Sequence, residues 1–327
     1  MTEKHEPSAQ EQGAQLAVVR EGILLWFDRN IRDLPWRRSR DPYQVLVSEV
    51  MLQQTQVDRV IPYFQRFLAQ FPTVYDLAAA PTAEVIRLWA GLGYNRRAVN
   101  LQRTARVIVD EHTGQFPREM ETMKGLPGIG DYTAGAIACF AFEQDVSFLD
   151  TNMRRVIERV FFGAEPDKSV SRNKAVREKA SRLMPAGDSW RWNQALIEFG
   201  ALQCTARKPL CVVCPIQAYC CAFPAVQTYI RSTRRTRDPV SREDSFTGSN
   251  RYYRGRVIDA LRKYPDDPAG VSLEELGAAV RDDFSYELLP WLDTLVRGLQ
   301  KDGLASIAEL KDQYDATGPS PVRVKLP

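Results

Sequence analysis

Four cysteines lie within seventeen residues of one another, in the segment 204–220. The intervals between Cys204, Cys211, Cys214 and Cys220 are six, two and five residues. Thiolates bind zinc or iron–sulfur clusters, and four of them this close together can surround one metal site. Structural zinc sites usually pair two C-x2-C knuckles, whereas this segment has a single one. The spacing alone leaves zinc, an iron–sulfur cluster and buried structural thiols open.

A carboxylate lies among apolar residues in the segment 48–57, SEVMLQQTQV. In a helix, Glu49 is beside Val50 and Met51, so we expect its carboxyl to be buried with a raised pKa. A carboxyl of this kind can act as a general acid near neutral pH. A salt-bridged surface glutamate is the alternative.

A second carboxylate, Asp150, follows the apolar residues Phe148 and Leu149 in the segment FLDTNMRRV. A charge is costly at such a place unless it is paired or takes part in chemistry. Aspartate also caps helices readily, so an N-cap is the alternative role for Asp150.

The segment 126–130, LPGIG, lies between two helical patterns. Pro127 ends the first helix, Gly128 and Gly130 permit a positive φ, and Asp131 is the expected cap of the second helix. Amides exposed at such a turn suit an anion such as a phosphate. An ordinary helical corner is the alternative.

In combination, these motifs resemble one family. The C-x6-C-x2-C-x5-C spacing is similar to that of iron–sulfur DNA glycosylases related to endonuclease III, and SEVMLQQTQV resembles the A/G-specific adenine glycosylases of the MutY type. The resemblance continues through LPWR at 34–37, GLGY at 91–94 and NQALIEFGA at 193–201, and covers roughly residues 20–222. It implies a [4Fe–4S] cluster on the four cysteines and a helix–hairpin–helix motif that binds the DNA backbone without base readout.

The resemblance also implies a mechanism. Glu49 would protonate N7 of a flipped-out adenine and then activate water, while Asp150 would stabilise the cationic sugar with Tyr132. Bifunctional relatives have a lysine in place of Tyr132 that forms a Schiff base. Tyrosine cannot do so, and we expect a monofunctional glycosylase, although a core tyrosine is the alternative reading.

Further residues take DNA-binding roles by the same resemblance. Extrusion of a base requires side chains that fill the stack, because unstacking costs a few kcal/mol. Polar surface residues and ordinary core residues are the alternatives for the members of this set. The residues are Gln54 and Leu92 as wedges, Thr55 near the orphaned base, Tyr94 as an intercalating ring, Arg32, Arg37 and Gln194 around the adenine, Asn152 beside Asp150, Gly128 and Gly130 in the hairpin, and Arg207 and Lys208 toward the backbone.

The chain departs from the family pattern in three places. We find no long C-terminal β-rich domain of the kind that recognises 8-oxoguanine, DTNM at 150–153 replaces the commoner DGNV, and Asn95 replaces a second tyrosine. These differences affect the expected specificity for the base opposite the adenine more than they affect the expected chemistry. The expected substrate is adenine opposite 8-oxoguanine or guanine, and a thymine or uracil mismatch glycosylase is the main alternative. A non-catalytic iron–sulfur DNA-binding protein is a further alternative, against which Glu49, Tyr132 and Asp150 together argue.

Helical patterns dominate the elements that must hold these residues. No strand alternation is evident before residue 230, and helices are expected at 16–31, at 43–69 with a break near Pro62, and after a cap at Thr82. The fold class is therefore all-α. Together with the resemblance, it predicts a helix–hairpin–helix glycosylase with a six-helix barrel, a cluster domain and a small winged-helix-like unit.

The expected domain boundaries follow these patterns along the 327 residues. The N-terminus has no apolar run, and no later segment approaches the ~20 apolar residues of a membrane span. A cytoplasmic, nucleoid-associated monomer bound to mismatched double-stranded DNA is therefore the expectation. The expected parts are 1–15 disordered, 16–36 with 151–228 as the cluster domain, 37–150 as the six-helix barrel, 229–250 as a basic linker, 251–312 as the winged-helix-like unit and 313–327 as a tail.

Overall fold

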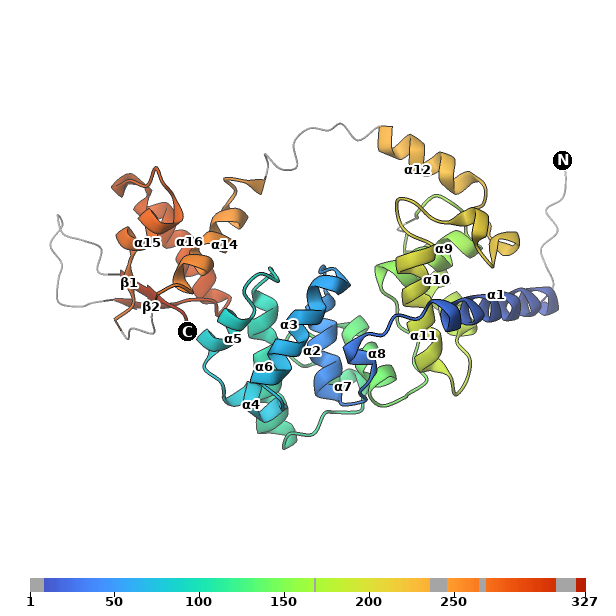
Figure 1. The fold of residues 1–327 in the computed structure, drawn as a ribbon, viewed down its shortest axis with the longest axis horizontal. Coiled ribbons are helices and arrows are strands. Elements are labelled where there is room, and N and C mark those ends of the chain that lie inside the picture. The colour runs from blue at the N-terminus through green and yellow to red at the C-terminus, as the bar shows by residue number, and fades with distance from the viewer. Residues whose placement is uncertain (1–8, 168, 236–245, 265–268, 310–321) are drawn as a thin grey trace. The chain divides into compact units, whose positions relative to one another are not determined.

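The computed structural model describes residues 9–167, 169–235, 246–264, 269–309 and 322–327. These residues fold mainly into helices, which Figure 1 shows in chain order. They form two compact units, described separately below. Unit 1 comes from 1–45, 118–125 and 129–238, and unit 2 from 46–117, 126–128 and 239–327. No described helix has the length and hydropathy that a membrane span requires.

Unit 1 is a helical body around the central helices α1 and α11. Helix α1 (Ala9–Asn30) buries Val19, Ile23 and Phe27 against α11 (Ser189–Glu198). Because these three residues recur at intervals of four, they lie on one face of the helix. Its other elements are η1 (Pro35–Arg37), the start of α2 (Pro42–Leu52), α7 (Met120–Lys124), α8 (Asp131–Phe140), α9 (Thr151–Phe161), α10 (Val170–Leu183), the π-helical turn η2 (Phe199–Gln203), η3 (Cys211–Val213), η4 (Gln217–Tyr219) and α12 (Ala225–Arg235).

The first part of unit 2 is a helical barrel segment. Helix α4 starts with a capping box between Thr73 and Asp76 and packs on α6. The rings of Phe67 and Trp89 meet edge-to-face at 6.0 Å in its core, and both side chains are fully buried. The helices are the end of α2 from Leu46, α3 (Val57–Gln70), α4 (Val74–Ala79), α5 (Thr82–Leu88) and α6 (Arg96–His112).

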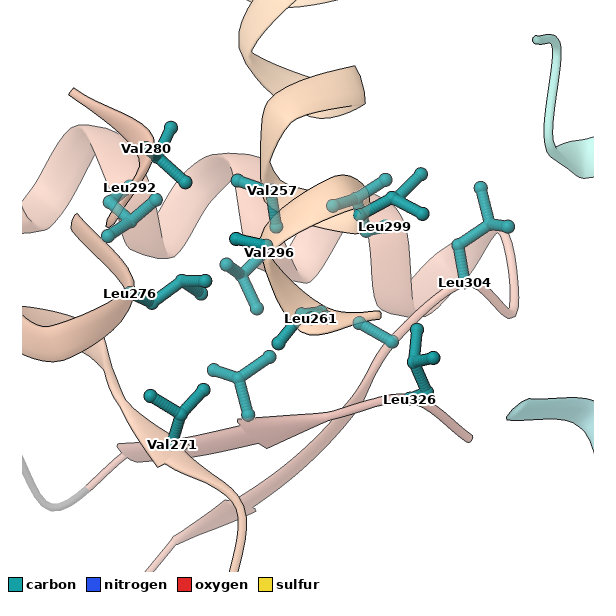
Figure 2. Packing of buried hydrophobic residues seen from close by; sticks show 14 of the residues in the cluster. Val257, Leu261, Val271, Leu276, Val280, Leu292, Val296, Leu299, Leu304 and Leu326 are labelled. Carbon is teal, nitrogen blue, oxygen red and sulfur yellow. The ribbon is translucent and has the colours of Figure 1, made fainter. Parts of the chain in front are cut away.

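The second part of unit 2 has the topology of a winged helix. Its three strands form an antiparallel sheet in the order β1-β3-β2, with Val271 opposite Val324 and Ile307 opposite the same residue. The helices lay Leu261, Leu276 and other apolar residues over this sheet (Figure 2). The elements are α14 (Asn250–Leu261), β1 (Val271–Ser272), α15 (Leu273–Val280), η5 (Tyr286–Leu288), α16 (Leu289–Lys301), β2 (Ser306–Glu309) and β3 (Val322–Lys325).

The winged-helix part shares a core with the barrel segment of unit 2. Ala83, Ile86 and Val99 of α5 and α6 belong to the same apolar cluster as Val257 and Leu299. Polar contacts add to it, because the Arg262 guanidinium donates to the Ile86 carbonyl at 3.0 and 3.1 Å and to Asn95 Oδ1 at 2.8 Å. The Ala83 N–H also donates to the Pro327 carbonyl at 2.8 Å.

Several expectations about local structure are wrong. Residues 9–15 are helical, and the interruption expected near Pro62 falls at 53–56, so that Pro62 lies inside α3. The helix caps at Thr82 and Asp131 are instead Pro81 and Gly130, each one residue earlier. Part of the expected tail is β3, the central strand of the sheet. Residues 236–245 of the expected linker and residues 313–321 of the expected tail lie outside the described residues.

Candidate active site and cluster loop

The four cysteines surround one cavity in unit 1. Cys204, Cys211, Cys214 and Cys220 line it together with apolar residues such as Ile216. Burial raises the pKa of Cys214 to about 11 and also raises the pKa values of Cys211 and Cys220. Such thiols stay protonated without a metal, and metal binding must displace their protons. Four soft donors around an apolar space fit an iron–sulfur cluster.

The cysteine loop is the candidate metal site among the described residues. Outside the cysteine loop, the described residues include no group of three or more His, Cys, Asp and Glu side chains that could hold a metal ion. The two remaining cysteines differ from the loop cysteines. Cys139 is buried beside Asn193 and Ser189, and Cys221 is exposed.

Helix α9 holds the cysteine loop through two arginines. Arg159 is 9% exposed and donates to Cys204 Sγ at 3.5 Å and to the Thr205 carbonyl at 2.7 Å. Arg155 donates to the Cys204 carbonyl at 2.9 Å and to the Gly200 carbonyl at 2.5 Å. Burial lowers the pKa of Arg155, an effect opposed by the charges of Cys204 and Asp150. The sequence alone did not reveal either arginine.

Asp150 is the N-cap of α9, and both of its carboxylate oxygens are occupied. Oδ1 accepts from the Met153 N–H at 2.6 Å, and Oδ2 accepts from Asn152 Nδ2 at 2.9 Å. Asn152 Oδ1 in turn accepts from Arg155 at 2.9 Å. A hydrogen-bonded path thus runs from the cysteine loop through Arg155 and Asn152 to Asp150, and the support expected from Asn152 is present.

Gly200 makes the close approach behind this path possible. A Cβ on Gly200 would stand 2.8 Å from Asn152 Cβ and 2.9 Å from its carbonyl oxygen. Any larger residue would push η2 away from the start of α9. The cap would then lose the support of the segment that leads to Cys204.

Three residues expected around the adenine lie together in unit 1. Arg37 Nε donates to Gln194 Oε1 at 2.7 Å, and Arg32 Nε lies 2.9 Å from Glu198 Oε2. Arg37 also reaches Glu198 at 2.6 Å, and the Glu198 side chain is fully buried. The sequence did not single out Glu198, although a charge within the apolar string NQALIEFGA was the available signal.

The hairpin segment has part of the local geometry expected of it, since Gly128 has a positive φ whereas Gly130 has a φ of −106°. Gly128 has a φ of +79°, which favours glycine, and Gly130 caps α8 without a side-chain cap. Thr104 Oγ1 donates to the Pro127 carbonyl at 2.7 Å. Tyr132 lies in the first turn of α8, with its ring 5.5 Å from that of Phe148.

Glu49 is buried in unit 2, as the sequence predicts. It is 6% exposed on α2, between Ser48 at 1% and Val50 at 6%. Three residues later the helix ends, and the loop 53–56 begins. The surface salt-bridge alternative is therefore excluded by burial.

Two loops of unit 2 bear the expected wedge residues. Gln54 and Tyr94 both adopt left-handed backbone conformations, with φ values of 56° and 48°. Tyr94 is 47% exposed, and Gln54 is exposed as well. Leu92 is only 5% exposed, and Thr55 is half-buried. Leu92 therefore lies in the core, whereas Tyr94, two residues later, is presented to solvent.

Arg97 ties these two loops together, and the sequence did not reveal it. Its Nη1 donates to the carbonyls of Val50, Met51 and Gln53 at 2.8, 3.0 and 2.7 Å. Its guanidinium also stacks near the rings of Trp89 and Tyr94. Burial lowers its pKa to about 10. Its Nη2 reaches Thr55 Oγ1 at 3.2 Å, the Leu92 carbonyl at 3.3 Å and the Gly93 carbonyl at 3.1 Å.

Family models agree with the helical hairpin and the cysteine loop. The model described as HhH-GPD superfamily base excision DNA repair protein matches residues 47–184. The model described as the iron-sulfur binding domain of endonuclease III matches 204–220, from the first cysteine of the loop to the last. The fold and these matches define a helix–hairpin–helix DNA glycosylase that binds DNA and has a [4Fe–4S] cluster.

Curated relatives narrow the class. Adenine DNA glycosylase of Mycolicibacterium smegmatis is 42% identical over 245 residues, which cover 73% of this chain and 79% of the relative. Adenine DNA glycosylase of Mus musculus is 43% identical over 224 residues, which cover 65% of this chain and 43% of that relative. The chain thus spans less than half the length of the mouse protein. The chain belongs to the adenine DNA glycosylase family, whose function is adenine excision in base excision repair.

Solved structures show the same fold. A thermostable thymine-DNA glycosylase is 31% identical with a TM-score of 0.61, and the match covers 67% of this chain and 99% of that one. A non-covalent endonuclease III–DNA complex has a TM-score of 0.58 at 24% identity, over 67% of this chain and 98% of that one, which shows the fold alone.

Proposed function

We propose that this chain hydrolyses the N-glycosidic bond of adenine mispaired with 8-oxoguanine or guanine in double-stranded DNA. The products are free adenine and an abasic site. The observation that carries the proposal is the burial of Glu49, which is 6% exposed at the end of a helix that leads into the loop of Gln54. A carboxyl withdrawn from water favours its protonated form, which a general acid requires.

Adenine excision needs such an acid, because adenine is a poor leaving group until N7 is protonated. In the proposal Glu49 donates this proton and then activates the attacking water. Asp150 stabilises the positive charge that develops on the sugar. Its two hydrogen bonds fix the carboxylate in one orientation, so little reorganisation is required as the charge develops.

The remaining site residues bind and position DNA in this proposal. Arg37 and Gln194 are hydrogen-bonded to each other, with Arg32 paired to the same glutamate as Arg37, which gives a preorganised polar wall for adenine. Tyr94 and Gln54 enter the base stack, with Leu92 and Thr55 behind them, and Gly128 and Gly130 approach the phosphate backbone. The cluster is held by Cys204, Cys211, Cys214 and Cys220. When bound, it would cross-link the loop and fix the position of Cys204, whose carbonyl accepts from Arg155 at the start of the hydrogen-bonded path to Asp150.

Tyr132 gives the proposal its monofunctional character. A phenol has no amine with which to form a Schiff base at C1′. We expect the chain to act as a monomer that leaves the DNA strand intact until alkali cleaves the abasic site. Borohydride should therefore trap no covalent complex between the enzyme and its substrate.

The similarity to a thymine-DNA glycosylase structure supports a second candidate function, excision of thymine or uracil from mismatches. Thymine and uracil depart as anions and need less help from an acid than adenine does. Glu49 and the higher identity to adenine glycosylases favour adenine.

A panel of duplexes tests both functions. Single-turnover excision is measured on duplexes with A, T or U opposite 8-oxoguanine or guanine, and alkali reveals the abasic sites. Adenine opposite either purine should react fastest, and Glu49→Gln should slow it by about 10²- to 10⁴-fold while duplex binding persists. Preference for T or U supports the second candidate, and undiminished excision by Glu49→Gln refutes the acid role.

A further inference from the structure

Three exposed side chains of unit 2 form a row, Tyr94–Arg251–Phe246. The Arg251 guanidinium lies 4.8 Å from the centre of the Tyr94 ring and 5.9 Å from that of Phe246. Tyr94 is 47% exposed and Phe246 is 48% exposed. Tyr94 comes from the barrel segment, whereas Arg251 and Phe246 come from the winged-helix part. The row therefore joins both parts of the unit.

The contacts between these two parts fix the row in place. Asp302, at the end of α16, accepts from Arg254 at 2.5 Å and lies 3.5 Å from Arg96 of α6. The shared apolar cluster contains Ile86 and Val257 from the two sides. Because α14 is anchored at both Arg254 and Arg262, its first turn is held beside the Tyr94 loop.

Arg251 differs from the other arginines of α14 in its contacts. Arg254 and Arg262 are engaged with Asp302 and Asp259, and Arg256 donates to Tyr252 Oη at 3.3 Å. Within the described part of the chain, the contacts of Arg251 are the two aromatic rings. Its fork of N–H donors is therefore available to a phosphate, the kind of acceptor that arginine binds best.

We propose that the Tyr94–Arg251–Phe246 row binds the DNA strand next to the point where Tyr94 enters the base stack. The winged-helix part would thereby extend the DNA-binding surface of the barrel. This inference depends on the proposed DNA-contacting role of Tyr94. Exposed aromatic rings beside an arginine suit nucleic acid, because the rings stack on bases and sugars while the guanidinium neutralises a phosphate.

Two observations indicate that the row binds DNA: the charge of the neighbouring helix and the continuity of the row with the Tyr94 loop. The residues from Arg251 to Lys263 contain five basic side chains and one acidic side chain, Asp259. The row also continues from Tyr94, which already belongs to the proposed DNA-binding loops. A protein partner would require a broader apolar patch than two half-exposed rings on either side of a cation.

Binding to a stable product analogue tests the row. The affinity of the full chain for a duplex with a tetrahydrofuran abasic analogue opposite guanine is measured by fluorescence anisotropy between 50 and 200 mM salt. Arg251→Ala should weaken binding about five-fold and lower the slope of log affinity against log salt by about 0.9, since one phosphate contact is lost. Arg251→Lys should keep the slope, and Phe246→Ala should weaken binding about five-fold or more at an unchanged slope.

Arg256→Ala is the matched control, since it removes the same charge from the same helix. Arg256 lies five residues later and about 140° around the helix, so its loss should leave the slope at the wild-type value. Equal slopes and affinities for Arg251→Ala and Arg256→Ala would overturn the inference. Wild-type affinity in Phe246→Ala would do so as well.

Two further measurements keep the outcomes separate. Thermal unfolding verifies that each variant is folded, and Arg251→Gln with Phe246→Ala carries the test if Arg251→Ala does not fold. Adenine excision by the wild-type chain is assayed independently. Its absence would refute the proposed function, whereas normal excision with unaltered binding by the row variants would refute the inference alone.

Discussion

Replacement of Arg97 by methionine would remove the side chain that links the loop 53–56 to the loop of Tyr94. All six oxygens that accept its hydrogen bonds belong to the main chain or to Thr55. Methionine keeps much of the aliphatic stem and its packing on Trp89 but leaves the five carbonyls without this donor. The substitution therefore separates hydrogen bonding and charge from bulk.

The size of the effect can be worked from these contacts. At a net value of about 1 kcal/mol for each hydrogen bond, six bonds give an upper bound of about 6 kcal/mol. Water can reach some of the released carbonyls, because the rims of both loops are exposed at Gln54 and Gly93. The substitution also removes the free-energy cost of burying the arginine's charge, which offsets part of the loss. We expect a loss of about 3 kcal/mol in unfolding free energy, or about 6–12 °C in Tm.

The loops should lose their positions as well as their stability. Gln54 and Tyr94 hold left-handed conformations that cost about 1 kcal/mol or more each. Without Arg97 these residues can relax toward ordinary backbone angles. A displacement of about 1 Å can cost about 10²-fold in rate, and we expect a decrease of that order in single-turnover adenine excision.

The assay combines thermal unfolding with single-turnover excision at saturating enzyme. Arg96→Met is the matched control, since Arg96 is adjacent on α6 but 65% exposed, with an ion pair to Asp302 that should contribute at most about 1 kcal/mol. Arg97→Lys keeps the charge but loses the forked guanidinium. Its Tm and its excision rate should lie between those of the wild type and those of Arg97→Met. A Tm within 2 °C (a limit of about the size expected for an exposed pair) and unchanged excision in Arg97→Met would refute the reasoning.

Three further predictions concern other parts of the chain. Asp150→Asn should retain the helix cap and change Tm little while excision falls about 10²- to 10³-fold, whereas Asp150→Ala should also lose about 1 kcal/mol in a denaturant titration. Burial raises the pKa of Cys139, so its ordinary thiol pKa of about 8.5 applies only when the chain is unfolded. The unfolding free energy should therefore fall as pH rises above about 8.5, and Cys139→Ala should fall less steeply. Val324→Asp places a charge at a fully buried position of the central strand and should unfold the winged-helix part and expose it to proteolysis, whereas Lys325→Asp, at an exposed position of the same strand, should not.

The sequence was most informative where chemistry depends on local spacing. The four cysteines, the glycine hairpin and the buried Glu49 are all recognisable within short segments. Asp150 was foreseen both as an N-cap and as a functional carboxylate, and the structure confirms the cap. Asn152 and Asp150 are only two residues apart in the sequence, so the contact between them could also be anticipated.

The residues that hold the site together could not be predicted in this way. Arg97 binds carbonyls that are up to 47 residues away in sequence, and Arg155 binds one that is 49 residues away. Carbonyl oxygens are present at every position, so no residue pattern marks these partners. Glu198 similarly acquires its role from two arginines on the distant segment 32–37.

The same limit explains the errors in the secondary structure. Pro62 suggested a break, yet the chain interrupts its helices at 53–56, where Arg97 supplies donors for the carbonyls that a helix end leaves unpaired. Strand β3 follows a polar segment with Gly, Pro and Ser, so it reads as a tail. In the structure it pairs with β1 and β2, and its alternate residues Val322 and Val324 are buried in the apolar cluster under the helices.

The proposed DNA-contacting loop of Tyr94 is held by contacts from both parts of unit 2. The ring of Tyr94 is near two guanidinium groups, that of Arg97 at 5.7 Å and that of Arg251 at 4.8 Å. Arg97 is anchored by main-chain carbonyls, and Arg251 belongs to a helix anchored through Arg254 and Arg262. Ordering an exposed aromatic side chain on binding costs about 0.5–1.5 kcal/mol, and an already ordered ring avoids much of this cost. If the loop of Tyr94 binds DNA as proposed, the winged-helix part can therefore add affinity, because its contacts hold that loop in place.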